Sequence, residues 1–210
     1  AKVAWRCDYL LSHASLQVQI QSCTVLECCF GFLKWVAEVG AADSDQSNGP
    51  KTAVLRQIHS SWTAISTRLR ALTDTVTLST NTSLLVVEPS STQPRAAMVG
   101  LGEQRIFLAK LLRLIGTMTE SADDFMASRL RNSVWPCVCK IVENYGDKAT
   151  QSKCPTQPRI ALETRRTSRQ NAALSESERN LLQSAIELWK RVYDHRATGV
   201  VLSGLIPSAG

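Results

Sequence analysis

Residues 101–145 of the 210-residue chain read LGEQRIFLAKLLRLIGTMTESADDFMASRLRNSVWPCVCKIVENY, and they carry its clearest helical pattern. In its first half, apolar residues recur at steps of three and four, with the basic residues Arg105, Lys110 and Arg113 between them. This is the 3.6-residue period of a helix that buries a broad face. The apolar positions are Ile106, Leu108, Leu111, Leu112, Leu114, Ile115 and Met118.

The second half predicts another helix, which follows a polar turn at residues 117–121. Ser121 is a suitable N-cap residue, and Asp123 and Asp124 would interact favourably with the dipole of the helix. Pro136 lies inside the apolar pattern, so we expect a kink or a break there. The apolar positions are Phe125, Leu130, Val134, Val138, Ile141, Val142 and Tyr145. A hairpin of two such helices cannot cover its own apolar face and needs neighbours.

Helical patterns on both sides of this hairpin can supply those neighbours. We expect a short helix over residues 1–13 and longer ones over 15–39 and 52–72. Their apolar positions are Val3, Trp5, Tyr9, Leu10 and Leu11, then Leu16, Ile20, Cys23, Leu26, Phe30, Leu33 and Val36, then Leu55, Ile58, Trp62, Ile65, Leu69 and Leu72. The sequence Ser175-Glu176-Ser177-Glu178 is a capping box that opens a further helix. Residues 199–210 suggest one more short helix, through Val201, Leu202, Leu205 and Ile206.

The predicted fold class is all-α, with antiparallel helix pairs whose apolar faces only stacking would cover. Such stacked pairs are typical of a HEAT-like, armadillo-type α-solenoid, and units of about 40 to 50 residues fit HEAT repeats. Periodicity alone leaves an irregular helical bundle open. The predicted organisation is HEAT-like repeats over 1–75, a polar loop insertion over 76–99, a repeat over 100–145, a basic polar insertion over 146–173 and terminal helices over 174–210.

The net charge is +6, and much of the basic excess lies in the polar segment Arg159–Arg169. We interpret this segment as a solvated loop, and a basic arm for nucleic acid is the alternative. The seven cysteines lie mostly within helical patterns, as buried thiols of a reducing compartment do. No apolar run approaches the roughly 20 residues that cross a bilayer. We therefore expect a cytoplasmic, or also nuclear, protein.

The sequence shows no catalytic or metal-binding pattern. It contains no Gly-x-Ser-x-Gly, no phosphate-binding glycine loop and no kinase motif set. The histidines are scattered, and Cys28-Cys29 and Cys137-x-Cys139 lack the spacing of a typical zinc pair. We therefore expect a protein that is not an enzyme and uses no cofactor or metal.

Five residues are candidates for binding another protein. His59 and Trp62 are three residues apart on one helical face, and Trp is enriched in interface hot spots. The alternative for both is packing between repeats. Arg129 and Arg131 are candidates for polar contacts with a partner, and Trp135 is either an exposed anchor or part of the core.

Two stretches carry a resemblance to a known family. The first is LRQIHSSWTAISTRL at residues 55–69, and the second is ADDFMASRLRNSVWP at residues 122–136. They resemble C-terminal HEAT repeats of the Tti-one family, the Tel-two-interacting proteins. In those repeats a His-Trp helix ends in Arg-Leu, and the next repeat has an acidic-Phe entry and a Val-x-Pro step. The resemblance covers roughly residues 5–145, and the insertions and the tail from Gly199 depart from it.

The resemblance implies a scaffold that binds other proteins. Tti-one proteins are α-solenoids of the TTT complex, with Tel-two and Tti-two. That complex works with the Hsp90 system in the maturation of phosphatidylinositol-3-kinase-related kinases. The C-terminal repeats of the family are associated with holding Tti-two, so we expect Tti-two-type and Tel-two-type partners. The competing hypothesis is a helical nucleic-acid-binding module that uses Arg159–Arg169.

Overall fold

The computed structural model describes residues 9–41, 48–82, 94–122, 124–151 and 174–194, which are helical almost throughout. The elements are the 3₁₀ turn η1 (Tyr9–Ser12), α2 (Leu16–Ala41), α3 (Asn48–Thr82), α4 (Pro94–Ala122), α5 (Asp124–Arg129), the π-helical turn η2 (Leu130–Val134), α6 (Trp135–Gln151) and α7 (Glu176–Asp194). The described ranges contain no strand. The all-α prediction is confirmed.

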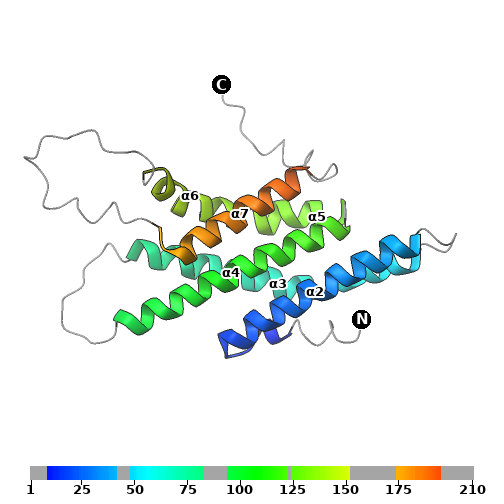
Figure 1. Cartoon of the computed structure of the whole chain (residues 1–210), viewed down its shortest axis with the longest axis horizontal. Coiled ribbons are helices and arrows are strands. Elements are labelled where there is room, and N and C mark those ends of the chain that lie inside the picture. Colours follow the sequence, from blue (N-terminus) through cyan, green and yellow to red (C-terminus); the bar gives the residue numbers. More distant parts are fainter. Residues whose placement is uncertain (1–8, 42–47, 83–93, 123, 152–173, 195–210) are drawn as a thin grey trace, which may run out of the picture.

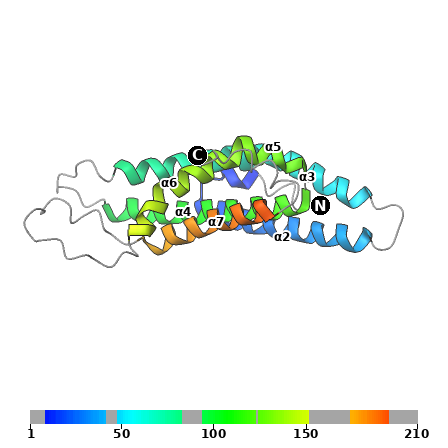
Figure 2. The same ribbon diagram turned by 90° about the horizontal axis from the view of Figure 1, so that it is seen from above.

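The helices form two layers, as Figures 1 and 2 show. Helices α2, α4 and α7 lie in one layer with α4 in the middle, and α3, α5 and α6 form the other. The chain alternates between the layers. Successive long helices are therefore antiparallel, while the helices within one layer run parallel to one another.

Polar side chains show that α2 and α4 pack in parallel and in a constant register. Three hydrogen bonds join the two helices, and each connects residues 86 positions apart in the sequence. They are Gln17 Nε2 to Glu103 Oε1 at 3.5 Å, Lys110 Nζ to Thr24 Oγ1 at 3.0 Å and Lys34 Nζ to Glu120 Oε2 at 3.3 Å. A constant separation requires both helices to advance in the same direction at the same rate.

Helix α4 is the centre of the core because helices of both layers pack against it. Its fully buried side chains are Phe107, Leu108, Leu111, Leu112, Leu114, Ile115 and Met118. The predicted apolar pattern is confirmed except at Ile106, which is 44% exposed while the adjacent Phe107 is buried. The positions of the neighbouring helices decide which side chains of α4 are buried. The 3.6-residue period alone does not show where the buried face ends.

Helix α4 also extends through the residues for which a turn was predicted. Residues 117–121 are helical, α4 ends at Ala122 and α5 begins at Asp124. The Thr119 hydroxyl donates to the Ile115 carbonyl at 2.8 Å, and the Ser121 hydroxyl donates to the Thr117 carbonyl at 2.9 Å. These hydroxyls bond within the helix, as Ser and Thr can in helix interiors, so Ser121 does not cap the next helix.

Helix α3 likewise runs beyond its predicted end at Leu72. The hydroxyls of Thr73, Thr75, Thr77 and Ser79 each donate to the carbonyl four residues earlier at 2.8 Å. Val76 is fully buried, so packing overrides the low helix propensity of this Thr-rich segment. Residues 76–82 and 94–99, predicted as loop, are thus helical, and so are residues 146–151. Residues 83–93 and 152–173 lie outside the described residues, and so does the short helix predicted over 199–210.

The N-terminal prediction is corrected in its described part. Residues 9–12 form a single 3₁₀ turn, in which Leu11 is buried against α2 and α3. Tyr9, predicted to be buried, is 66% exposed because so short a turn presents few side chains to the core. Val3 and Trp5 lie outside the described residues.

The predicted break near Pro136 is confirmed as the π-helical turn η2. The Trp135 N–H donates to the Leu130 carbonyl, five residues back. Pro136 lacks the N–H that the Asn132 carbonyl would accept in an α-helix. Arg70 of α3 donates to that carbonyl at 3.4 Å and to the Ser133 hydroxyl at 3.1 Å. A side chain of the neighbouring helix therefore stabilises the irregular turn.

The capping box at the start of α7 is confirmed. The Glu178 N–H donates to Ser175 Oγ at 3.3 Å, and the Ser175 N–H donates to Glu178 Oε2 at 2.9 Å. Glu178 also forms a largely buried ion pair with Arg105 of α4, at 3.1 Å. The cap that starts α7 thus also connects it to the central helix.

Because α4 lies at the centre of the core, alanine substitutions on its two faces should differ widely in their effect on the free energy of unfolding. Leu112→Ala should lower the free energy of unfolding by about 2–5 kcal/mol, because it leaves a cavity in the core. Ile106→Ala should lower it by less than about 1 kcal/mol, because Ile106 is partly in solvent. Urea unfolding followed by circular dichroism measures both values. Equal costs would show that the core is not centred on this face of α4.

Substitution by alanine should have different effects on stability at two glycines of α4. A Cβ at Gly102 would meet no atom within 4 Å, so Gly102→Ala should stabilise the protein by about 0.5–1 kcal/mol. A Cβ at Gly116 would lie 3.3 Å from Arg191 Nη1 and 3.4 Å from Arg191 Cδ. Gly116→Ala should gain less, because Arg191 must move. Thermal unfolding measures both variants, and an equal gain at Gly116 would contradict this close approach of α7.

Candidate partner-binding surfaces

Three of the five predicted residues meet in one cluster between α3 and α5, which we call the Arg129 cluster: His59, Trp62, Phe125 and Arg129. The Arg129 guanidinium lies 3.9 Å from the centroid of the Phe125 ring and 6.0 Å from that of Trp62. Its Nη2 atom lies 3.1 Å from Nδ1 of His59. Phe125 was predicted only as a core position, and its ring completes the stack.

Arg129 makes two hydrogen bonds inside the protein. Its Nη1 donates to the Phe125 carbonyl at 2.8 Å. A guanidinium can only donate, so in this contact Nδ1 of His59 is the acceptor. Partial burial lowers the pKa of Arg129 below its ordinary value. The cluster thus joins α3 to α5, and the edge of His59 remains exposed.

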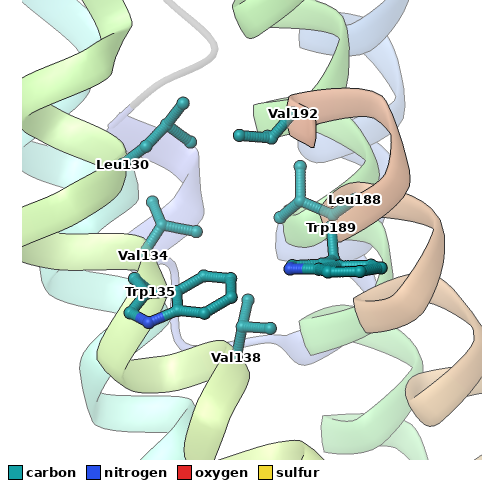
Figure 3. A pocket seen from close by; sticks show the side chains of 7 residues that line it. All are labelled: Leu130, Val134, Trp135, Val138, Leu188, Trp189 and Val192. Carbon is teal, nitrogen blue, oxygen red and sulfur yellow. The ribbon is translucent and has the colours of Figure 1, made fainter. Parts of the chain in front are cut away.

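The other two predicted residues lie apart from this cluster. Arg131 is exposed on the π-helical turn η2. Trp135 is half-buried and packs against the core at the start of α6. It faces α7, where it lines a groove together with Trp189 (Figure 3).

The groove between α6 and α7, which we call the α6–α7 groove, is almost entirely apolar. Its outer part has a volume of about 380 Å³. That part is lined by Trp135, Val138, Cys139, Val142, Glu143, Ala185, Ile186 and Trp189. Leu130 and Val134 face Leu188 and Val192 in the narrower part that continues along η2 and α7 (Figure 3). Val142 and Ile186 are 40% and 38% exposed, so the groove opens to solvent.

A second apolar surface lies on α2, and we call it the α2 stripe: Val25, Cys28, Phe32, Trp35 and Val39. Phe32 is 62% exposed and Trp35 is 57% exposed, with ring centroids 5.9 Å apart. The five positions follow steps of three, four, three and four, which is the a/d spacing of a helix that packs against another helix. The stripe is not among the predicted apolar positions, because the neighbouring stripe through Phe30 already accounts for a buried face of this helix. The spacing was the signal that could have revealed it.

Three cysteines of the described segments, Cys23, Cys137 and Cys139, have thiol pKa values above the ordinary value. Burial raises the pKa of Cys23 to about 12, and it also raises the pKa of Cys137 and Cys139. These thiols are therefore protonated near neutral pH, and the thiolate is the form that attacks or binds metal. In the described part of the chain, no three His, Cys, Asp or Glu side chains are placed to hold a metal ion. Nor does any described helix have the length and apolarity to span a membrane.

No protein-family model, curated protein or solved structure matches this chain.

Arg129 and Arg131 should differ clearly in their contribution to the free energy of unfolding. Arg129→Ala should lower the free energy of unfolding by about 1–2 kcal/mol, because it removes the stacking on Phe125 and two hydrogen bonds. Arg131→Ala, on the exposed side of η2, should change it by less than about 0.5 kcal/mol. Urea unfolding of both variants tests this. A stable Arg129→Ala variant would mean that Arg129 does not join α3 to α5.

Proposed function

We propose that this chain is a non-catalytic, protein-binding scaffold of the HEAT-like α-solenoid type. Two observations support the repeat arrangement. The chain alternates between two layers, and within one layer α2 and α4 pack in parallel with a constant separation of 86 residues. Stacked helix pairs with equivalent neighbours have this geometry.

The α2 stripe is the observation that carries the binding role. It places two large aromatic side chains in solvent on the edge helix of the first layer. Exposed contiguous apolar patches of this kind mark interaction sites, and aromatic residues are enriched in interface cores. The a/d spacing suits an amphipathic helix of a partner protein, which would pack along α2 as a neighbouring helix of a layer does.

The proposed partners follow from the family resemblance. The two stretches that resemble Tti-one proteins lie in α3 and in α5 to α6, and the Arg129 cluster joins them. On this basis, we propose that the chain acts in a TTT-type assembly with Tti-two-type and Tel-two-type subunits. Such an assembly would assist Hsp90-dependent maturation of phosphatidylinositol-3-kinase-related kinases, in the cytoplasm and also in the nucleus.

Capture of purified partners tests this proposal. The chain of residues 1–210 should retain recombinant Tti-two in a stoichiometric complex that resists moderate salt, because apolar contacts are not screened. Phe32→Glu with Trp35→Glu should weaken capture by tenfold or more, since two hot-spot aromatics are worth about 2 kcal/mol or more each. The matched control is Gln21→Glu with Thr67→Glu, on exposed positions of α2 and α3 outside the stripe. Circular dichroism verifies that all variants are folded.

Other outcomes would redirect the assignment. Equal capture by the stripe variant and its control would remove the α2 stripe from the interface, and Arg129→Glu with Arg131→Glu would then test the second layer. Absence of capture by the folded chain would overturn the TTT-type assignment. Binding to nucleic acid that collapses with salt and requires Arg159–Arg169 would favour the competing module.

A further inference from the structure

The α6–α7 groove has a buried floor, an exposed mouth and the size of a ligand pocket. Val138 and Ala185 are buried at its floor, and Val142 and Ile186 are exposed at its mouth. Its volume of about 380 Å³ lies within the range of about 300 to 1,000 Å³ that is typical of ligand pockets. Helix α6 packs against α3 and helix α7 packs against α4, so the core holds both walls of the groove in place.

The walls of the groove favour an apolar ligand body. Trp135 and Trp189 stand on its opposite sides (Figure 3), and both are half-buried. Tryptophan rings offer a large and rigid contact surface to an apolar group. Water in this space would find few polar partners, so occupation by apolar groups is favourable.

One acidic group stands at the mouth of this apolar groove. Glu143 is the one charged side chain among the residues that line either part of it, and it is exposed. Within the described part of the chain, the Glu143 carboxylate forms no hydrogen bond or ion pair. The lysines of the same helix have other contacts. Lys140 pairs with Asp74 of α3 at 2.8 Å, and the Lys148 ammonium lies 5.7 Å from the centroid of the Tyr145 ring.

The negative charge of Glu143 acts inside the groove. Cys139 lies one helical turn before Glu143 and lines the same groove. Burial raises the pKa of the Cys139 thiol, and the negative charge of Glu143 raises it further. A ligand in the groove would therefore be close enough to interact with this charge.

From these observations we propose that the α6–α7 groove binds a small organic cation with an apolar body. The body lies between Trp135 and Trp189 over the buried floor, and the ammonium group lies at the mouth beside Glu143. The carboxylate attracts the cation, and the faces of tryptophan rings attract cations as well. Glu143 repels an anionic ligand with the same body. The groove and the α2 stripe lie at different edges of the first layer, so this proposal does not depend on the proposed function.

Three ligands with the same body and different charge test the proposal: phenylbutylamine, phenylbutanol and phenylbutanoate. Ligand-observed NMR titrations with the full chain at neutral pH measure their Kd values. The amine should bind about tenfold more tightly than the carboxylate, with the alcohol between them, because exposed ion pairs and cation–π contacts are each modest. The preference for the amine should decrease as salt is added, since the charges lie at the mouth.

Substitutions at the mouth provide the matched comparison. Glu143→Gln should remove most of the preference for the amine, and Glu143→Lys should make the carboxylate the tightest of the three ligands. The control is Glu38→Gln, which removes an exposed carboxylate from α2 and should leave the order of the Kd values unchanged. Circular dichroism verifies that the variants are folded.

Alkylation of Cys139 by iodoacetamide, followed by peptide-resolved mass spectrometry, locates the ligand. Saturating phenylbutanol should slow this reaction by about threefold or more, because access controls the reaction of a thiol. The exposed Cys28 of α2 should react at an unchanged rate. Three results would overturn the proposal: no binding of the amine at millimolar concentration, an unchanged Cys139 rate, or a preference for the amine that persists in Glu143→Lys.

Discussion

The contacts of helix α4 with both layers are the constraint on which this structure depends. Its apolar side chains from Phe107 to Met118 are buried against helices on several sides, so each neighbour must fit a shared surface. Close-packed interiors leave little freedom for such helices to shift independently. Polar contacts with Lys110, Glu120 and Arg105 then join α2 and α7 to the same helix. The position of α4 therefore determines the distance and register of the whole first layer.

Parallel stacking of this kind buries the middle helix, α4, and leaves an edge on each side of it. At one edge, α2 exposes Phe32 and Trp35, and at the other, α6 and α7 form an apolar groove around Trp135 and Trp189. A closed bundle would cover both surfaces. In a stack of helices, a cap or a partner protein must cover them. We propose a partner helix for the first edge.

The π-helical turn before Pro136 links these features to a local constraint. Because proline removes one N–H, the chain cannot continue as a regular α-helix there, and Arg70 of α3 donates to the Asn132 carbonyl instead. Such turns are frequently found at functional sites. Here the turn lies between Arg129, which stacks on Phe125 against α3, and Trp135, which faces α7. One irregular turn therefore separates a residue of the Arg129 cluster from a residue of the groove.

Features that depend on residues three to five positions apart can be predicted from the sequence alone. These are the helical periods, the capping box at Ser175 and the break near Pro136, since their hydrogen bonds and sterics are local. Only the tertiary structure decided which of two similar stripes on α2 is buried, because Phe30 and Phe32 differ in neighbours and not in chemistry. It also extended α3 through Thr77 and brought Arg129 to His59, 70 residues away. Periodicity shows that a helix has a buried face, but the positions of the other helices decide which residues belong to it.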